Sequence, residues 1–206
     1  MRPVPGVLLS ALLLAAIGSM SGCGTSPPVR FFTLASEGLR AAPAGSLTYS
    51  VVVGPVTVPE LVDRQQLVLR ASPNRVEIAE QARWAAPLKS EIPRVIADHL
   101  GRMLGEVRTS TFSERATGIP DYRVVIDIQR FETAPGEGAT IQALWTVRPR
   151  DGEAVTGQSL TSEAAGPGYD ELVAAHSRAL GAVSREVAAA IAAIRARAPS
   201  GPDIAR

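Results

Sequence analysis

The chain has 206 residues, and 21 basic side chains against 20 acidic ones give it a formal net charge of +1. Proteins that bind nucleic acid normally carry a basic excess gathered on one face, so this balance argues against a nucleic-acid partner. The only lysine, Lys89, does not belong to a GxxxxGK[ST] loop, which excludes an ATPase of the P-loop type.

The first residues have the order of a secretory signal. Arg2 supplies a positive start, and the apolar run at residues 7–17 is too short to cross a bilayer as a helix, which needs about 20 residues. Small residues then lead to the only cysteine, Cys23. A basic residue, a short apolar run and a small-residue site are typical of a signal peptide, which we predict over residues 1–22.

The residues directly before Cys23 are similar to a lipobox, the substrate of lipoprotein signal peptidase, although Met20 stands where leucine is usual. Acylation of Cys23, with palmitate as one of the chains, would explain a lone cysteine in an oxidising compartment, where cysteines normally pair. Several acyl chains hold a protein firmly on a membrane, whereas one does not. Gly24, by resemblance to the sorting rule of enteric bacteria, favours the outer membrane. The alternative is an ordinary signal peptide followed by a chance free thiol.

The mature chain divides into three parts. Residues 23–48 hold the lipidated cysteine, a tether and an extended segment in which residues 30–34 are β-prone. Residues 49–198 form the domain, and residues 199–206 form a flexible tail. This length is enough for one domain with its own core.

Two groups of strands are predicted before the first helix. β-Branched residues at 49–58 indicate a buried strand. Gly54-Pro55 within it indicates a bulge or a sheet edge, because proline cannot donate a hydrogen bond to the ladder. Residues 67–70 and 75–78, joined by a Pro-Asn turn, are predicted to form a hairpin.

Apolar residues at helical spacing predict a helix over residues 85–104. Pro87 suits its first turn. Pro93 does not suit a helix interior, so we expect a kink there or a later start. A short strand at residues 107–111 is expected to follow.

Alternating apolar and polar residues predict three consecutive antiparallel strands at residues 122–129, 141–147 and 155–162, separated by turns rich in glycine. The longest helix is predicted over residues 169–198, where an apolar stripe must lie on the sheet, and Pro199 ends it. The sequence therefore predicts a single α/β domain with a mixed, mostly antiparallel sheet and two main helices.

Patterns for catalysis or metal binding are few. His99 and His176 both fall on apolar helix stripes, which favours packing over ligation, and no HExxH, CxxC or GxSxG motif is present. Residues 166–168, Gly-Pro-Gly, lead into the last helix and either bind an anion at its N-terminus or form a flexible loop. The neighbouring carboxylates Glu60 and Asp63 carry almost no specificity. We expect no enzyme, no cofactor and no metal.

Several segments carry a family resemblance in order along nearly the whole mature chain. The most specific is GPVTVPELVDRQQLVLR at residues 54–70. The others are RFFTL at 30–34, RWAAPL at 83–88, the strand ending QRFE at 122–132 and ALW at 143–145. These segments resemble the PqiC/YmbA-type lipoproteins, the auxiliary component of ABC-type transport systems of the MCE lipid-transport kind. Met20, Ala86 and Pro93 depart from the family's pattern.

The resemblance implies a fold like the N-terminal domain of TolB and a place on the outer membrane, facing the periplasm. It implies partnership with an MCE-domain protein, an inner-membrane permease and its ATPase, which together move lipids or hydrophobic solutes across the envelope. The residues that match the signature, and so are candidates for docking a partner, are Gly54, Pro55, Pro59, Asp63, Arg64, Arg70, Trp84 and Trp145.

Two pairs of these candidates have an alternative interpretation. Asp63 and Arg64 lie at a turn stiffened by prolines, where charged groups can select a partner by electrostatic complementarity. Equally, the two would form an internal ion pair that fixes the turn. Trp84 and Trp145 are either core residues or interface anchors, and burial is the more common fate of tryptophan.

Three functions stay open at this point. The leading hypothesis is a lipid-anchored docking subunit of an envelope transport system. The second is a periplasmic shuttle that holds a lipid in its own cavity, and the third is an envelope lipoprotein that regulates cell-wall synthesis. The sequence does not decide between a single copy and a homo-oligomer.

Overall fold

The protein is described by a computed structural model over residues 27–36, 48–105, 107–113 and 118–197. The predicted signal peptide, Cys23, Gly24 and the C-terminal tail lie outside the described residues, so the predictions for them remain predictions. Within the described ranges, neither helix combines the length and the apolar character that crossing a membrane would require.

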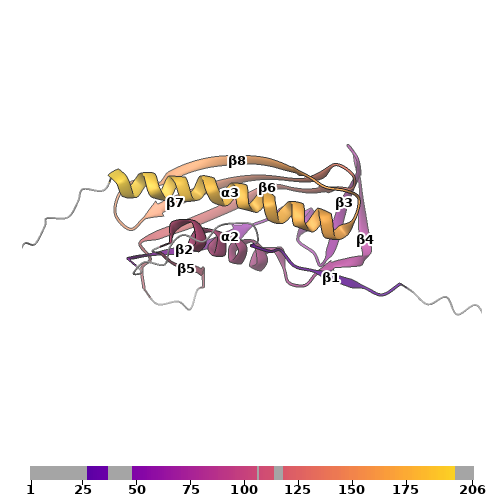
Figure 1. Ribbon diagram of the computed structural model, residues 1–206, viewed down its shortest axis with the longest axis horizontal. Coiled ribbons are helices and arrows are strands. Elements are labelled where there is room, and N and C mark those ends of the chain that lie inside the picture. The colour runs from indigo at the N-terminus through magenta and orange to yellow at the C-terminus, as the bar shows by residue number, and fades with distance from the viewer. Residues whose placement is uncertain (1–26, 37–47, 106, 114–117, 198–206) are drawn as a thin grey trace, which may run out of the picture.

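The described residues form one eight-stranded mixed sheet with two helices packed on one of its faces (Figure 1). This confirms the predicted mixed sheet with two main helices. In chain order the elements are β1 (Arg30–Phe32), β2 (Tyr49–Thr57), the 3-10 helix η2 (Glu60–Val62), β3 (Gln66–Ser72), β4 (Arg75–Trp84), α2 (Leu88–Leu104), β5 (Val107–Thr111), β6 (Tyr122–Ala134), β7 (Gly138–Pro149), β8 (Val155–Ala164) and α3 (Tyr169–Arg197).

Strand β6 organises the sheet, because strands pair along both of its edges. Antiparallel β7 follows the whole of one edge, and β8 pairs with the far side of β7, as the sequence predicts for three consecutive strands. On the other edge, β2 runs parallel to the first half of β6, and β3 meets its end where Leu69 lies opposite Thr133. The sheet therefore divides into two arms, β2–β5 at one end and β3–β4–β1 at the other.

The helices close the buried face of the sheet. α3 packs on β7 and β8, α2 packs on β2 and β5, and the two helices contact each other (Figure 1). Each fully buried aliphatic side chain contributes roughly 1.5–3 kcal/mol, so this layer holds the fold together. Its largest fully buried members are Leu34, Leu67, Leu88, Ile92, Ile96, Leu100, Ile126, Ile128, Ile141, Leu172, Leu180 and Ile191.

The irregularity predicted at Gly54-Pro55 is a bulge inside the sheet and not a sheet edge. The register between β2 and β6 shifts between Val53 and Val56, and β2 lies between β5 and β6. Gly54 has a φ of +122°, and a Cβ at this position would lie 2.9 Å from the Cβ of Phe112. Glycine alone fits both conditions without strain.

Helix α2 begins at Leu88, later than the start predicted at residue 85. The reason is a long-range contact: the N–H of Ala85 donates to the carbonyl of Phe32, 2.7 Å away, and so continues the pairing of β4 with β1. Pro93 remains inside α2. Its missing N–H removes the bond to the Lys89 carbonyl, and Lys89 is exposed, so water can replace that donor.

Strand β1 lies within residues 23–48, the range that the sequence sets apart from the domain, yet it is part of the sheet. It pairs in parallel with β4, with Phe31 opposite Arg83 and Phe32 opposite Trp84. Strand β4 is longer than the predicted strand at residues 75–78, because its second half carries this pairing.

Candidate functional site

The segment that best matches the family, residues 54–70, runs from β2 through η2 into β3 and brings its charged residues to two places. The first is the turn after η2. The carbonyl of Pro59 accepts hydrogen bonds from the N–H groups of Val62 and Asp63, at 3.1 and 3.2 Å, which closes the turn. The turn is therefore rigid, as the prolines in the sequence suggest.

The charged side chains of this turn do not pair with each other. The Asp63 carboxylate accepts from the Nζ of Lys89 at 2.6 Å, so it ties the turn to the start of α2. Arg64 is exposed, and its guanidinium forms no ion pair within the part of the chain that the structure describes. The internal Asp63–Arg64 ion pair that the sequence offered as one alternative is wrong, and Arg64 is left as a free positive group on the surface.

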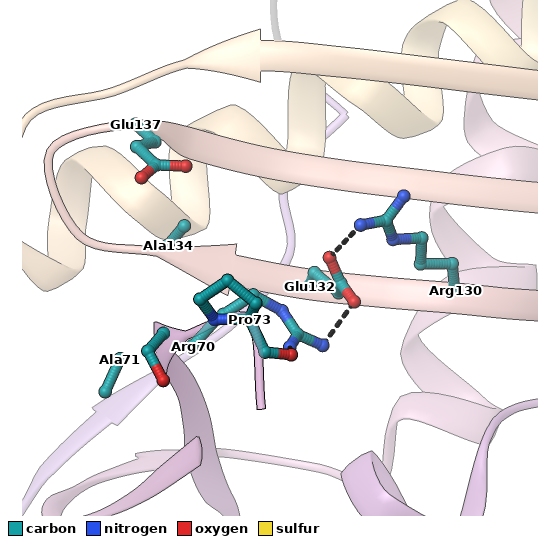
Figure 2. A pocket seen from close by; sticks show the side chains of 8 residues that line it. Arg70, Ala71, Pro73, Arg130, Glu132, Ala134 and Glu137 are labelled. Carbon is teal, nitrogen blue, oxygen red and sulfur yellow. Dashed lines mark hydrogen bonds and ion pairs between the residues drawn. The ribbon is translucent and has the colours of Figure 1, made fainter. Parts of the chain in front are cut away.

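The second place is a group of charged side chains that we call the Arg70 cluster: Arg70, Arg130 and Glu132. Glu132 lies between the two guanidinium groups (Figure 2). One carboxylate oxygen pairs with Arg70, and the other accepts from Nη2 of Arg130 at 2.6 Å. Arg70 also donates from Nη1 to the carbonyl of Pro73, at 3.0 Å. The cluster thus fastens the turn between β3 and β4 to the edge of β6.

The Arg70 cluster lines an open surface hollow of about 440 Å³, into which Glu137 also faces from the turn between β6 and β7 (Figure 2). An adjoining hollow of about 430 Å³ shares the cluster and continues over β7 and β8. Burial alone would raise the pKa of Glu132, but hydrogen bonds and charge from Arg130 and Arg70 outweigh it and lower the pKa. Glu132 therefore stays ionised.

This arrangement suits recognition and not acid–base chemistry. A general base needs a carboxylate that can take up a proton near the working pH, whereas both oxygens of Glu132 are held by guanidinium groups. Groups of three or more metal-ligating side chains do not occur among the residues described here. What the cluster offers is planar donors at a fixed position, which select a partner by charge and shape.

The two signature tryptophans lie in the core. Trp84 is 4% exposed and packs edge-on against Phe131, with ring centres 6.0 Å apart. Trp145 is 8% exposed, and its indole N–H donates to Oγ of Ser159 at 2.9 Å. Of the two interpretations that the sequence left open, the structure places both residues in the core.

Both histidines are buried, as their positions on apolar stripes predict. Nε2 of His176 lies 2.7 Å from Oγ1 of Thr133, and its ring stacks on Phe131 with centres 3.9 Å apart. Burial lowers the pKa of His176 to about 3. His99 lies 3.1 Å from Oγ of Ser184, and burial lowers its pKa to about 4. Both rings are therefore neutral near pH 7.

The start of α3 does not present an open anion site. A Cβ added to Gly166 would lie 2.0 Å from Oε2 of Glu171, so the helix's own carboxylate lies against this loop. Glu171 belongs to the first turn of α3, where negative charge is favourable. Of the two readings of residues 166–168, the structure favours a loop that leads into the helix.

One set of contacts was not predicted from the sequence, namely those of Glu91 with the segment after β1. Glu91 is 8% exposed, and its carboxylate accepts from the N–H of Leu34 at 3.2 Å and from the hydroxyl of Thr33. Arg94 donates to Glu91 at 2.9 Å and to the Leu34 carbonyl at 2.8 Å. The Glu91–Arg94 spacing is visible in the sequence, but it is equally typical of an exposed helix pair.

Comparison with known proteins identifies the family. The family model described as "ABC-type transport auxiliary lipoprotein component" matches residues 32–188. The chain belongs to this family. This match confirms the resemblance carried by residues 54–70 and the other segments. A search of curated proteins finds no match. Membership makes the protein an envelope lipoprotein that is auxiliary to ABC-type transport, a class that is anchored to a membrane and is not a class of enzymes.

Two crystal structures show the same fold as this family member. One, of an uncharacterized protein, has a TM-score of 0.66 and 17% sequence identity, and the match covers 80% of this chain and 99% of that chain. The other, a protein from Xanthomonas campestris, has a TM-score of 0.57 and 18% identity, covering 77% of this chain and 92% of that chain. At this level of identity the likeness concerns the fold alone.

Proposed function

We propose that the protein is a lipid-anchored docking subunit that holds the MCE-domain protein of an ABC-type lipid transporter at the outer membrane. The family match over residues 32–188 carries this proposal. Cys23 supplies the membrane attachment, the domain faces the periplasm, and the transported cargo is a lipid or another hydrophobic solute. The protein contributes contacts to the transport system and no chemical step.

The geometry of the signature supports docking through its charged groups. Arg64 is exposed just before β3, and Arg70 lies near the other end of the same strand, within the Arg70 cluster. Arg64 therefore presents an exposed positive charge at one end of the strand, whereas the charge of Arg70 at the other end is paired with Glu132. Charges fixed in this way raise the association rate and reject partners with the wrong pattern. An acidic surface on the partner is the complement that this pattern fits.

The interior argues against the second candidate, a shuttle that carries lipid in its own cavity. Such a shuttle would hold its cargo between the helices and the sheet, where this protein has fully buried side chains, among them Ile96, Leu100, Ile126 and Leu180. The two hollows beside the Arg70 cluster lie on the surface and are lined by charged residues. Native mass spectrometry should therefore find only covalently attached lipid, and a stoichiometric non-covalent lipid would favour the shuttle.

The docking function is tested by recovery of the transport partners from native membranes. The tagged, full-length protein is extracted in mild detergent from cells that produce the neighbouring transport proteins, and the MCE-domain protein is measured in the bound fraction. We expect Arg64→Glu to reduce this recovery, because it reverses an exposed charge of the signature. Arg108→Glu is the matched control, since Arg108 is an exposed arginine on β5, in the other arm of the sheet.

The outcomes separate the parts of the proposal. Recovery with the parent and the control, and reduced recovery with Arg64→Glu, supports docking through the signature. Equal recovery with all three would show that Arg64 is not part of the interface, while the partnership itself would stand. A parent protein that recovers no MCE-domain protein would contradict the proposed function itself.

A further inference from the structure

The chain that leads from Cys23 into the domain is held firmly from β1 onward. β1 pairs with β4, and the Leu34 backbone is bound by Glu91 at its N–H and by Arg94 at its carbonyl. The next N–H, that of Ala35, donates to Oγ of Ser177 on α3 at 3.1 Å. The orientation of this segment is thus fixed relative to both helices.

Within this segment the side chains divide sharply by exposure. Phe32 and Leu34 are buried, at 8% and 1% exposure. Phe31, directly before Phe32 in the sequence, is 64% exposed, and Val29 is 38% exposed. The fixed strand therefore holds the ring of Phe31 out in water, where its apolar area is not covered by the described part of the chain.

The distance to the predicted lipid is short. Val29 follows Cys23 by six residues. A fully extended chain spans at most about 3.3–3.6 Å per residue, so Val29 lies within roughly 20 Å of the acylated residue. Pro27 and Pro28, both exposed, restrict this stretch further. The exposed apolar side chains are therefore kept close to the membrane surface.

We propose that Val29 and Phe31 insert into the surface of the membrane that carries the acyl chains of Cys23. The inference rests on the lipid-anchored part of the proposed function. Phenylalanine is common on the apolar face of segments that lie at the boundary between head groups and acyl chains. The Arg30 guanidinium lies over the rings of Phe32 and Tyr169, at 5.6 and 5.1 Å, and stays half exposed, within reach of lipid phosphates despite a weak pair with Asp170 at 4.0 Å.

A second contact beside the covalent anchor fixes which part of the molecule faces the bilayer. β1 and the first turn of α3 lie at one end of the long axis, and the last turn of α3 lies at the other (Figure 1). With Phe31 inserted in the membrane surface, the end of the domain that carries β1 stays at the membrane. The end with β5 and the C-terminus of α3 then remains away from the anchor and open to the periplasm.

The test places a fluorescent reporter at the proposed contact. The lipidated, full-length mature protein with Phe31→Trp is reconstituted into vesicles of phosphatidylethanolamine and phosphatidylglycerol, with or without bromine on the acyl chains. Ile119→Trp is the matched control, because Ile119 is 75% exposed and precedes β6 at the opposite end of the sheet. The buried Trp84 and Trp145 give a constant background, which the parent protein measures.

We expect bromine to quench the added signal of Phe31→Trp about twofold or more, since an interfacial side chain lies within roughly 5–10 Å of the acyl boundary. Ile119→Trp should be unaffected. Equal, water-like emission from both variants on vesicle-bound protein would overturn the inference while leaving lipid anchoring and docking in place. A lipidated protein that does not stay with vesicles would overturn it together with the anchoring. Recovery of the MCE-domain protein, measured on the same variant, reports on docking separately.

Discussion

Glu91 shows how one side chain connects the segment after β1 to helix α2. Its carboxylate accepts from the Leu34 N–H, from Thr33 and from Arg94. Burial alone would raise the pKa of Glu91, but these hydrogen bonds and the Arg94 charge outweigh it and lower the pKa. The group is therefore an ionised, almost buried acceptor whose loss leaves several donors unsatisfied.

We expect Glu91→Ala to destabilise the protein by about 2 kcal/mol, because buried donors lose their acceptor. Glu77→Ala is the matched control, since Glu77 pairs with Arg75 on the surface, where such pairs contribute less than about 1 kcal/mol. Urea unfolding followed by circular dichroism measures both variants. Limited proteolysis should also cut the Glu91→Ala protein faster near β1. Equal midpoints for the two variants would contradict this account of the Glu91 contacts.

The two buried histidines make stability depend on pH. Burial lowers the pKa of His176 to about 3 and that of His99 to about 4, whereas the unfolded chain binds these protons near pH 6.5. The unfolded state therefore gains protons first as the pH falls. Stability is fully present above about pH 6.5 and is lost as the pH falls from there toward the folded pKa values.

Between pH 7 and pH 5 we expect the parent to lose up to about 2 kcal/mol for each histidine, from roughly 1.4 kcal/mol per pH unit below the unfolded pKa. The variant His176→Gln, whose amide can still bond to Thr133, should lose only about half as much over the same interval. Urea midpoints at the two pH values give both losses. A variant with the same pH dependence as the parent would show that His176 does not carry this effect.

At this scale the sequence predicts burial better than it predicts partners. The apolar stripes place His99 and His176 in the core correctly, because periodicity reports which face of a helix is covered. The partner of Asp63 was not predictable. It is Lys89, which is far along the chain and close only after the turn folds onto α2. Arg70 and Glu132 meet in the same non-local way, so the signature indicated Arg70 but not its cluster.

Among the elements, the bulge in β2 imposes the strictest condition on the sequence. Gly54 combines a positive φ with a close approach to Phe112, whereas Gly136, in the turn between β6 and β7, has a positive φ of +81° and open space around it. Substitutions at these two glycines therefore distinguish the energetic cost of a strained backbone from the added cost of a steric clash.

We expect Gly136→Ala to cost about 1 kcal/mol, the strain of an alanine at positive φ. Gly54→Ala should cost at least about 2 kcal/mol, because its Cβ must also displace Phe112 or the strand that carries it. Thermal unfolding by calorimetry compares the two. Similar melting temperatures for both variants would mean that the packing of β2 against Phe112 is looser than the 2.9 Å approach implies.

Local periodicity in the sequence predicts most of the helices and strands, but it does not predict the residues at which they begin and end. The sequence predicts the hairpin of β3 and β4, the three strands β6 to β8, and both helices in the right order. The predicted β4 ends too early and the predicted α2 begins too early, because the pairing of β4 with β1 is a contact between distant residues. The sequence offers no means of seeing that the edge of β6 opposite β7 pairs with both β2 and β3.

For the molecule as a whole, the arrangement of its ends relates the proposed anchor to the proposed docking surface. The chain enters through β1 at one end of the long axis and leaves through α3 at the other (Figure 1). Arg70 belongs to the same arm of the sheet as β1, and β5 belongs to the other arm. The sequence indicates one domain and its class, but only the paired strands show which charged groups share an arm with β1.

The attachment itself is tested by Cys23→Ser. Each buried CH₂ contributes about 0.8 kcal/mol, so loss of all acyl chains removes nearly the whole affinity for the membrane. We expect the variant to be exported and to appear in the periplasmic fraction, while the parent stays with the envelope membranes. The exposed pair Val29 and Phe31 is too small to hold the domain there alone, because two partly buried side chains contribute only a few kcal/mol, about 2 each. A Cys23→Ser protein that remained with the membranes as completely as the parent would contradict acylation as the anchor, and intact mass measurement of the parent, which should show the acyl groups, would decide whether another contact takes that role.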